Sequence, residues 1–269
     1  MAKESKTKKA EAGATRAKRG RGKAKAAKSH DETRTRKSKN PKLVIRPLQM
    51  GDIDAIQALH HRCFPGIEPF SEEHLAAQLE RFAEGQIGVE LDGALVATSS
   101  SLILHSDDVD VPHTYHDVSD DGLIRAHDPT GDTLYGIDIA VHPDVRGWRL
   151  ARRIYDARKE LVTRMNLRRI VVAGRIPGFQ AKARDMEVDD YVRLVVSKHL
   201  TDPVLTTQRA NGFAVRGILK DYLPSDYESL GHAVLLEWLN PDFVPDHDTM
   251  ARASVRVSAV QYQMRAIDS

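Results

Sequence analysis

The chain has 269 residues, of which 41% are apolar and 29% are charged, and it contains a single cysteine. This composition is ordinary for a globular protein, and one cysteine excludes a disulfide framework within the chain, so we expect a reducing compartment, the cytoplasm. No apolar run approaches the roughly 18 residues that a membrane span needs, and the N-terminus lacks the apolar segment of a signal peptide.

Charge divides the chain unevenly. Residues 1–42 hold 16 Lys and Arg against 4 Asp and Glu, a net charge of +12, whereas residues 43–269 hold 24 against 34, a net charge of −10. The basic segment has no aromatic residue and cannot bury enough surface to offset the entropy of ordering, so we predict a disordered tail. A solubilising role is the simpler interpretation, and electrostatic contact with nucleic acid is the alternative.

Residues 43–104 predict a strand, two amphipathic helices and a β-hairpin, in that order. The strand covers residues 43–47, the helices open at Gly51-Asp52 and at Ser71, and the hairpin strands cover residues 86–91 and 94–104. The hairpin carries the clearest signal, because Asp92-Gly93 is a favoured two-residue turn between alternating strands.

A polar segment follows at residues 105–132. It carries His105, His113 and His116 together with several aspartates, among them Asp107, Asp108, Asp110, Asp117 and Asp120. A loop of this length in a compact domain is usually functional or disordered. The spacing of the His and Asp residues matches no metal motif, so we expect no metal and an acidic surface that attracts a cationic amine.

The remaining elements alternate between strands and helices. They are a strand at 133–141, a helix at 150–165, a strand at 169–174, a helical insertion at 180–200, a helix that starts at Asp202-Pro203 and stops at Gly212, and closing strands at 213–220 and 231–238. This order predicts a mixed α/β domain at residues 43–240, with helices on both faces of one sheet, followed by a linker at 241–254.

The segment from Ile137 to Arg153 carries the main chemical signal. An apolar strand runs through a proline-marked turn into a helix, whose unpaired N–H groups and dipole suit an anion such as a pyrophosphate. Gly147 permits close approach of the backbone. Four arginines add positive charge, namely Arg146, Arg149, Arg152 and Arg153. An ordinary β–α turn with a solvated basic helix start is the alternative.

This segment resembles motif A of the GNAT acetyltransferases, the pattern Arg/Gln-x-x-Gly-x-Gly/Ala after a strand and a Val-x-Pro turn. The matching residues are Arg146-Gly147-Trp148-Arg149-Leu150-Ala151. The resemblance covers about residues 43–240 and implies a GNAT-like, mostly antiparallel sheet, in which strands four and five splay apart to admit the pantetheine of acetyl-CoA.

The resemblance also implies roles for individual residues. Backbone groups of Ile139 and Val141 would bond the pantetheine and the acetyl carbonyl. The pyrophosphate would be held beside Arg146 by the amides of Gly147, Trp148, Arg149, Leu150, Ala151 and Arg152.

Two positions depart from the family pattern. Arg149 occupies the central glycine position, where we expect the amide to point inward and the side chain to reach a phosphate. Residues 203–213 resemble the helix beside the cofactor thiol, which often carries a tyrosine that protonates the leaving thiolate. That position is Gln208, which cannot act as an acid. The remaining candidates are solvent, Tyr191, Tyr222 and Tyr227.

The expected mechanism is direct attack of a neutral amine on the thioester. The Val141 amide would stabilise the oxyanion. Asp138 is the candidate base, because a carboxylate within an apolar strand is costly unless it is used or paired. Pairing with an arginine, or exposure on the other strand face, is the alternative. His113 and His116 are weaker candidates for the base.

The C-terminal residues 255–269 have an alternating, β-branched pattern. They resemble the first strand of carbon–nitrogen hydrolases of the nitrilase superfamily, to which a GNAT module is fused in some proteins. The resemblance implies a sequence truncated after the first hydrolase strand. We predict no amidase or nitrilase activity here, because the Glu, Lys and Cys triad of these hydrolases lies downstream of that strand and is absent, and Cys63 lies in the first helix of the GNAT-like domain.

The sequence therefore predicts an acetyl-CoA-dependent N-acetyltransferase that acts on a small-molecule or protein amine. The alternative is a non-catalytic acyl-CoA-binding module that regulates a carbon–nitrogen hydrolase, present as a partner or as a domain of a longer form.

Overall fold

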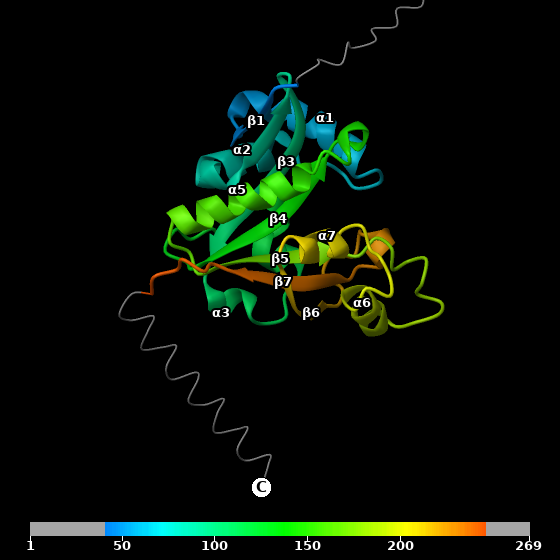
Figure 1. Cartoon of the computed structure of the whole chain (residues 1–269). Helices are drawn as coiled ribbons and strands as arrows, with labels where there is room; N and C mark the ends of the chain where they lie inside the picture. Colours follow the sequence, from blue (N-terminus) through cyan, green and yellow to red (C-terminus); the bar gives the residue numbers. More distant parts are fainter. Residues whose placement is uncertain (1–40, 246–269) are drawn as a thin grey trace, which may run out of the picture. The chain divides into compact units, whose positions relative to one another are not determined.

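The computed structural model describes residues 41–245, and they form one sheet covered by helices (Figure 1). The predicted hydrolase strand at 255–269, most of the linker and all but two residues of the predicted basic tail lie outside the described residues. Within residues 41–245, no helix is long and apolar enough to cross a membrane.

Seven strands form the sheet, in the order β1-β2-β3-β4-β5-β7-β6 (Figure 1). They are β1 (Leu43–Pro47), β2 (Ile87–Leu91), β3 (Ala94–Leu104), β4 (Thr133–Val141), β5 (Arg169–Arg175), β6 (Ala214–Leu219) and β7 (Ala233–Leu239). All neighbouring strands are antiparallel except β4 and β5, which are parallel. The prediction of a mixed, mostly antiparallel GNAT-like sheet is confirmed.

Helices cover both faces of this sheet. They are α1 (Ile53–Cys63), α2 (Glu72–Phe82), α3 (Ser106–Val109), α4 (Tyr115–Ser119), α5 (Leu150–Arg164), α6 (Val188–Val196) and α7 (Leu205–Ala210), with short 3-10 turns between them. Thr98 of β3 contacts His60 of α1, whereas the adjacent Ala97 packs in one cluster with Leu150 and Ile154 of α5. Because neighbouring strand residues point to opposite faces, α1 and α5 lie on opposite sides of the sheet.

Two predicted segments differ from the structure. The helical insertion expected at 180–200 is helical only over α6, because its apolar stripe is confined to Val188, Tyr191, Val192 and Val195. The polar segment at 105–132 contains the short helices α3 and α4, which are too brief to show a helical period in the sequence.

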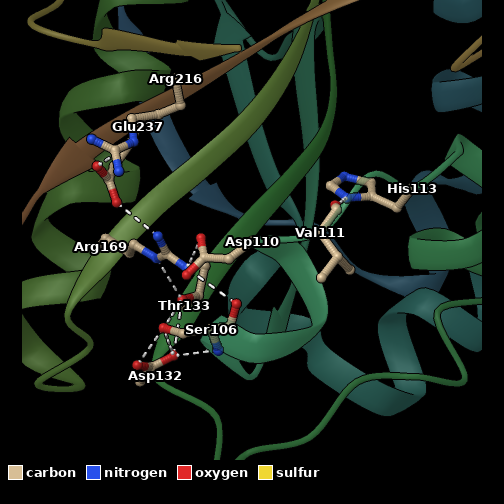
Figure 2. A network of polar contacts seen from close by, with 9 residues as sticks. All are labelled: Ser106, Asp110, Val111, His113, Asp132, Thr133, Arg169, Arg216 and Glu237. Atoms are coloured by element: carbon tan, nitrogen blue, oxygen red, sulfur yellow. Dashed lines mark hydrogen bonds and ion pairs between the residues drawn. The ribbon is translucent and has the colours of Figure 1, made fainter. Parts of the chain in front are cut away.

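A buried arginine anchors this polar segment to the sheet (Figure 2). Arg169 of β5 donates to Glu237 of β7 at 2.8 Å and to Thr133 at 3.0 Å, and its guanidinium lies 2.9 Å from Asp110. The Arg169 side chain is 5% exposed and the Glu237 side chain 8% exposed. Such a pair is costly to break, because either partner alone is an uncompensated buried charge.

We therefore expect Arg169→Met to lower the free energy of unfolding by roughly 3 kcal/mol, because it leaves the Glu237 carboxylate buried with only the exposed Arg216 nearby. Urea denaturation followed by circular dichroism measures the change. The double variant Arg169→Met/Glu237→Gln removes the stranded charge and should recover most of the loss. A loss in Arg169→Met below about 1 kcal/mol would contradict the assignment.

Candidate functional site

The sheet opens between β4 and β5. The two strands pair over four residue pairs, from Thr133↔Arg169 to Gly136↔Val172, although β4 continues to Val141 and β5 to Arg175. A bulge marks this point, since Ser100 pairs with Asp138 and the next residue of β3 pairs with Gly136. The backbone of β4 beyond Gly136 therefore has no partner strand on its β5 side.

The amides of Ile139 and Val141 point to this open side. His142 donates its N–H to Val96 on the β3 side at 2.9 Å. Because backbone N–H groups alternate in direction along a strand, the amides of residues 139 and 141 point the opposite way. The backbone groups expected to bond an extended ligand are thus placed on the open edge of β4.

A cavity of about 690 Å³ occupies the opening. Its lining combines strand residues at the end of the β4–β5 pairing with side chains from α1, α5 and α7. The polar and glycine residues of this lining include His60, Gly136, Asp138, Arg158, Gly174 and Gln208. This volume is in the range of small-molecule sites.

Asp138, the predicted base, faces His60 in this cavity. Asp138 Oδ1 accepts the N–H of Ser100 at 2.7 Å, and Asp138 Oδ2 lies 3.4 Å from His60 Nε2. His60 Nε2 is also 3.2 Å from Thr98 Oγ1, and the ring is 4% exposed. The carboxylate therefore pairs with a histidine. The sequence does not reveal this partner, because His60 continues the buried stripe of α1.

The predicted anion-binding turn follows β4. The first helical bond of α5 runs from Arg153 N to Arg149 O at 3.2 Å, which leaves the amides of Leu150, Ala151 and Arg152 without a helical partner. Gly147 has a φ of +95°. The surrounding side chains are exposed at Arg146, Trp148, Arg149, Arg152 and Arg153. The turn thus presents free amides and mobile positive charge to solvent.

Arg149 adopts the conformation that favours glycine. It precedes α5 with φ 58° and ψ 31°, in the left-handed region, and its side chain makes no capping hydrogen bond. This backbone geometry explains why the family pattern has glycine at this position. The arginine keeps the same turn at a cost of roughly 1–2 kcal/mol in backbone strain.

Gln208, at the family's tyrosine position, lies in the cavity. It is 4% exposed, its amide packs against Gly174, and its Oε1 has no hydrogen-bond partner. Tyr155 of α5 also lines the cavity; burial raises the pKa of Tyr155, and the charge of Arg158 and a hydrogen bond with Gln208 partly oppose this rise.

The three tyrosines proposed as alternative acids have different surroundings. Tyr222 lines the cavity, and its hydroxyl lies 3.1 Å from that of Tyr135. Tyr191 instead donates to Asp202 at 2.9 Å, and Tyr227 is 72% exposed. Of these three, Tyr222 is therefore the one that the structure brings to the opening, although burial raises its pKa well above the usual value.

The two candidate histidines of the polar segment, His113 and His116, make no hydrogen bond or ion pair with Asp138. His113 is buried between the Val111 carbonyl and the Tyr135 hydroxyl, at 2.8 and 2.9 Å, and burial lowers its pKa. His116 pairs with Asp121 at 2.8 Å on the surface, and that bond raises its pKa. Both side chains already have protein partners, so neither replaces the pair formed by His60 and Asp138.

Cys63, at the end of α1, lies beside the open edge of β4. Burial raises the pKa of its thiol, whereas the positive charge of Arg146 and the N–H of Val141 act in the opposite direction. The thiol is partly exposed. The chain's single cysteine thus lies between the anion-binding turn and the backbone amide expected to face the thioester.

Comparison with known proteins identifies the family. Residues 53–186 match the model of the Acetyltransferase (GNAT) family. The uncharacterized N-acetyltransferase YkwB of Bacillus subtilis (strain 168) is 32% identical over 202 residues, which are 74% of this chain and 89% of that protein. The chain belongs to the GNAT acetyltransferase family.

A second relative is longer than this chain. The protein named Probable hydrolase YhcX, also from Bacillus subtilis (strain 168), is 42% identical over 231 residues. The match covers 85% of this chain and 45% of that relative. This GNAT chain therefore spans less than half the length of YhcX.

Solved structures share the fold at low sequence identity. The GphF GNAT-like decarboxylase in complex with isobutyryl-CoA superposes with a TM-score of 0.63 at 23% identity, over 73% of this chain and 98% of that one. The loading GNATL domain of CurA from Lyngbya majuscula gives 0.65 at 17% identity, over 74% and 98%. Since one of these is described as a decarboxylase, the fold alone does not define the reaction.

We expect Arg149→Gly to raise the free energy of unfolding by about 1 kcal/mol, because glycine adopts the left-handed conformation without strain. The melting temperature should rise by about 2–4 °C, as measured by calorimetry. Arg149→Ala is the matched control, since it removes the guanidinium and keeps the strained Cβ. Equal stability of the Gly and Ala variants would contradict this account.

Proposed function

We propose that this chain is an acetyl-CoA-dependent N-acetyltransferase that transfers the acetyl group to an amine by direct attack on the thioester. The observation that carries the proposal is the open edge of β4, which leads from the anion-binding turn to the pair formed by Asp138 and His60. Membership of the GNAT family and similarity to YkwB support it.

The turn between β4 and α5 would hold the pyrophosphate. Free amides at the start of a helix and a positive-φ glycine suit an anion that approaches the backbone closely. Arg146 and Arg152 would add charge-assisted bonds to the phosphates. The pantetheine would then extend along β4, bonding the backbone of Ile139 and Val141.

Asp138 and His60 would remove the proton from the amine. In the proposed step, the amine nitrogen attacks the carbonyl carbon while the carbonyl oxygen becomes an oxyanion that the Val141 N–H stabilises. The nitrogen gives its proton to the histidine–aspartate pair, directly or through water. Collapse of the intermediate breaks the carbon–sulfur bond, and the thiolate leaves as CoA after taking a proton from solvent or from Tyr222.

The acceptor would be a cationic amine before it loses its proton. Two exposed carboxylates, Glu68 and Asp121, are part of the cavity lining. Negative charge at the mouth of a cleft raises the local concentration of cations. The acceptor can be a small molecule or the amine of a protein.

A second candidate function is a non-catalytic acyl-CoA-binding module that regulates a carbon–nitrogen hydrolase. Gln208 in place of a phenol favours it, as does the greater length of YhcX, whose name is that of a hydrolase. Release of free thiol from acetyl-CoA in the presence of a panel of amines distinguishes the two, since a regulatory module binds the donor without consuming it.

Acetyl-CoA should protect Cys63 from alkylation by N-ethylmaleimide. The chain has no other cysteine, and the thiol lies where the donor would pass Val141 and Arg146. At a donor concentration ten times its Kd, the rate should fall about tenfold by mass action, as measured by mass spectrometry.

The double variant Arg146→Ala/Arg152→Ala should weaken this protection, whereas the control Arg164→Ala, at the other end of α5, should not. An unchanged alkylation rate at millimolar acetyl-CoA would contradict donor binding at this site.

Asp138→Asn should lower kcat by about 100- to 10,000-fold, the usual range for loss of a general base. His60→Gln should act in the same direction, and the double variant should be little worse than either single one, because the two groups work as a unit. Acetyl-CoA affinity should stay within about twofold. The control Asp144→Asn changes an exposed carboxylate beside the turn; if it lowered kcat as much, the assignment would be wrong.

A further inference from the structure

Arg158 is a fully buried arginine at the inner end of the cavity. It extends from α5 and is 1% exposed. Its Nη2 donates to the carbonyls of Ser100 and Asp138, at 2.7 and 2.8 Å, and these two residues pair with each other next to the bulge. A Cβ at Gly136 would lie 2.5 Å from Arg158 Nη1, so the guanidinium lies directly where β4 and β5 stop pairing.

The charge of Arg158 has no carboxylate partner. Residues 41–245 bury two arginines, and Arg169 contacts the carboxylates of Glu237 and Asp110 at 2.8 and 2.9 Å (Figure 2). Within the same part of the chain, no carboxylate oxygen lies within 4.0 Å of Arg158. The nearby Asp138 directs its two carboxylate oxygens to Ser100 and His60.

Burial without an ion pair affects the pKa of the Arg158 guanidinium. Desolvation lowers the pKa of Arg158, and the more distant charges of Tyr155 and Asp138 oppose this only in part. For Arg175, bonds to Asp226 outweigh desolvation and raise the pKa. An isolated buried cation is costly, so its retention in a cavity calls for an anionic partner.

Unsatisfied atoms are concentrated in this cavity. Five buried side-chain atoms of the described residues have no hydrogen-bond partner, and three of them belong to residues that line it. The three are Asp138 Oδ2, which lies 3.4 Å from His60 Nε2 without forming a hydrogen bond, Arg158 Nε and Gln208 Oε1. Buried polar atoms are normally bonded, so Arg158 Nε points to an acceptor on a ligand, whereas Asp138 Oδ2 and Gln208 Oε1 point to donors.

We propose that Arg158 binds a carboxylate of the substrate. The inference rests on the proposed function and names the substrate class: one substrate carries a carboxylate close to the reacting carbonyl. A guanidinium donates charge-assisted hydrogen bonds to a carboxylate, and the Nε–H of Arg158, which has no acceptor among the described residues, can supply one.

Two sources share this chemistry. The carboxylate belongs either to the acyl group of a dicarboxylic acyl-CoA or to an amino-acid acceptor. Arg158 comes from α5, the helix whose first turn would hold the donor's phosphates, while His60 and Asp138 approach from the α1 side. The experiment therefore has a donor arm and an acceptor arm.

The donor arm compares malonyl-CoA and succinyl-CoA with acetyl-CoA by calorimetry. The acceptor arm compares α-amino acids with their amides by the ratio of kcat/KM, with acetyl-CoA as donor. In one arm the wild-type protein should prefer the carboxylate-bearing member by about 10- to 100-fold, as expected for charge-assisted bonds. Arg158→Met should reduce that preference to about twofold or less.

The control Arg164→Met removes an exposed arginine of the same helix and should leave the preference unchanged. If Arg158→Met does not fold, Arg158→Lys keeps the charge but lacks the Nε–H donor of the guanidinium and should reduce the preference at least about fivefold. A merely structural role would lower the melting temperature without changing the ratio between matched ligands. The proposal is overturned if the wild type shows no preference for the carboxylate-bearing ligand in either arm, or if Arg158→Met keeps the wild-type preference.

Free succinate and malonate separate this inference from the proposed function. If acetyl-CoA does not bind but either dianion raises the melting temperature of the wild type and not of Arg158→Met, the carboxylate site stands and the acetyltransferase proposal fails. If acetyl-CoA binds and is consumed without any carboxylate preference, the acetyltransferase proposal stands and the carboxylate site is refuted.

Discussion

The pairing between β4 and β5 ends at Gly136↔Val172, and the rest of the site depends on this early end. A parallel pair normally continues its hydrogen bonds along both strands, so the edge of β4 beyond Gly136 is left with donors and acceptors that need a partner. The guanidinium of Arg158 occupies the side-chain space that glycine leaves vacant, and it bonds the carbonyls of two paired residues next to the bulge. Arg158 thus stabilises the opening and places a positive charge at its inner end.

Much of the fold could be predicted because its signals are local. Asp92-Gly93 specified the hairpin, and regular apolar stripes specified α1, α2 and α5. The short α3 and α4 could not be predicted, since a helix of four or five residues shows no full period. The pair formed by His60 and Asp138 joins α1 to β4, which are far apart in the sequence, and no local pattern encodes such a contact. The position of Arg158 is visible in the sequence, because it lies on the buried stripe of α5 between Ile154 and Leu161.

The two departures from the family motif have different physical consequences. Arg149 adopts the left-handed backbone conformation that favours glycine. The turn therefore keeps its shape, and the arginine lowers the stability of the protein. Gln208 keeps the position of the tyrosine but removes an acidic proton, so this change alters chemistry rather than shape. In the proposed function, donor binding would therefore depend on the turn, while protonation of the leaving thiolate would need another group.

In the proposed function, the charges of the site would act on different parts of a substrate. His60 and Asp138 are on the side of α1, where an amine can give up its proton, and Arg158 extends from α5 on the opposite side. A donor or acceptor without a carboxylate would leave the guanidinium buried and unpaired when water is displaced from the cavity. The resulting desolvation cost falls on the wrong substrate alone, which is how a buried polar group discriminates more sharply than an apolar pocket.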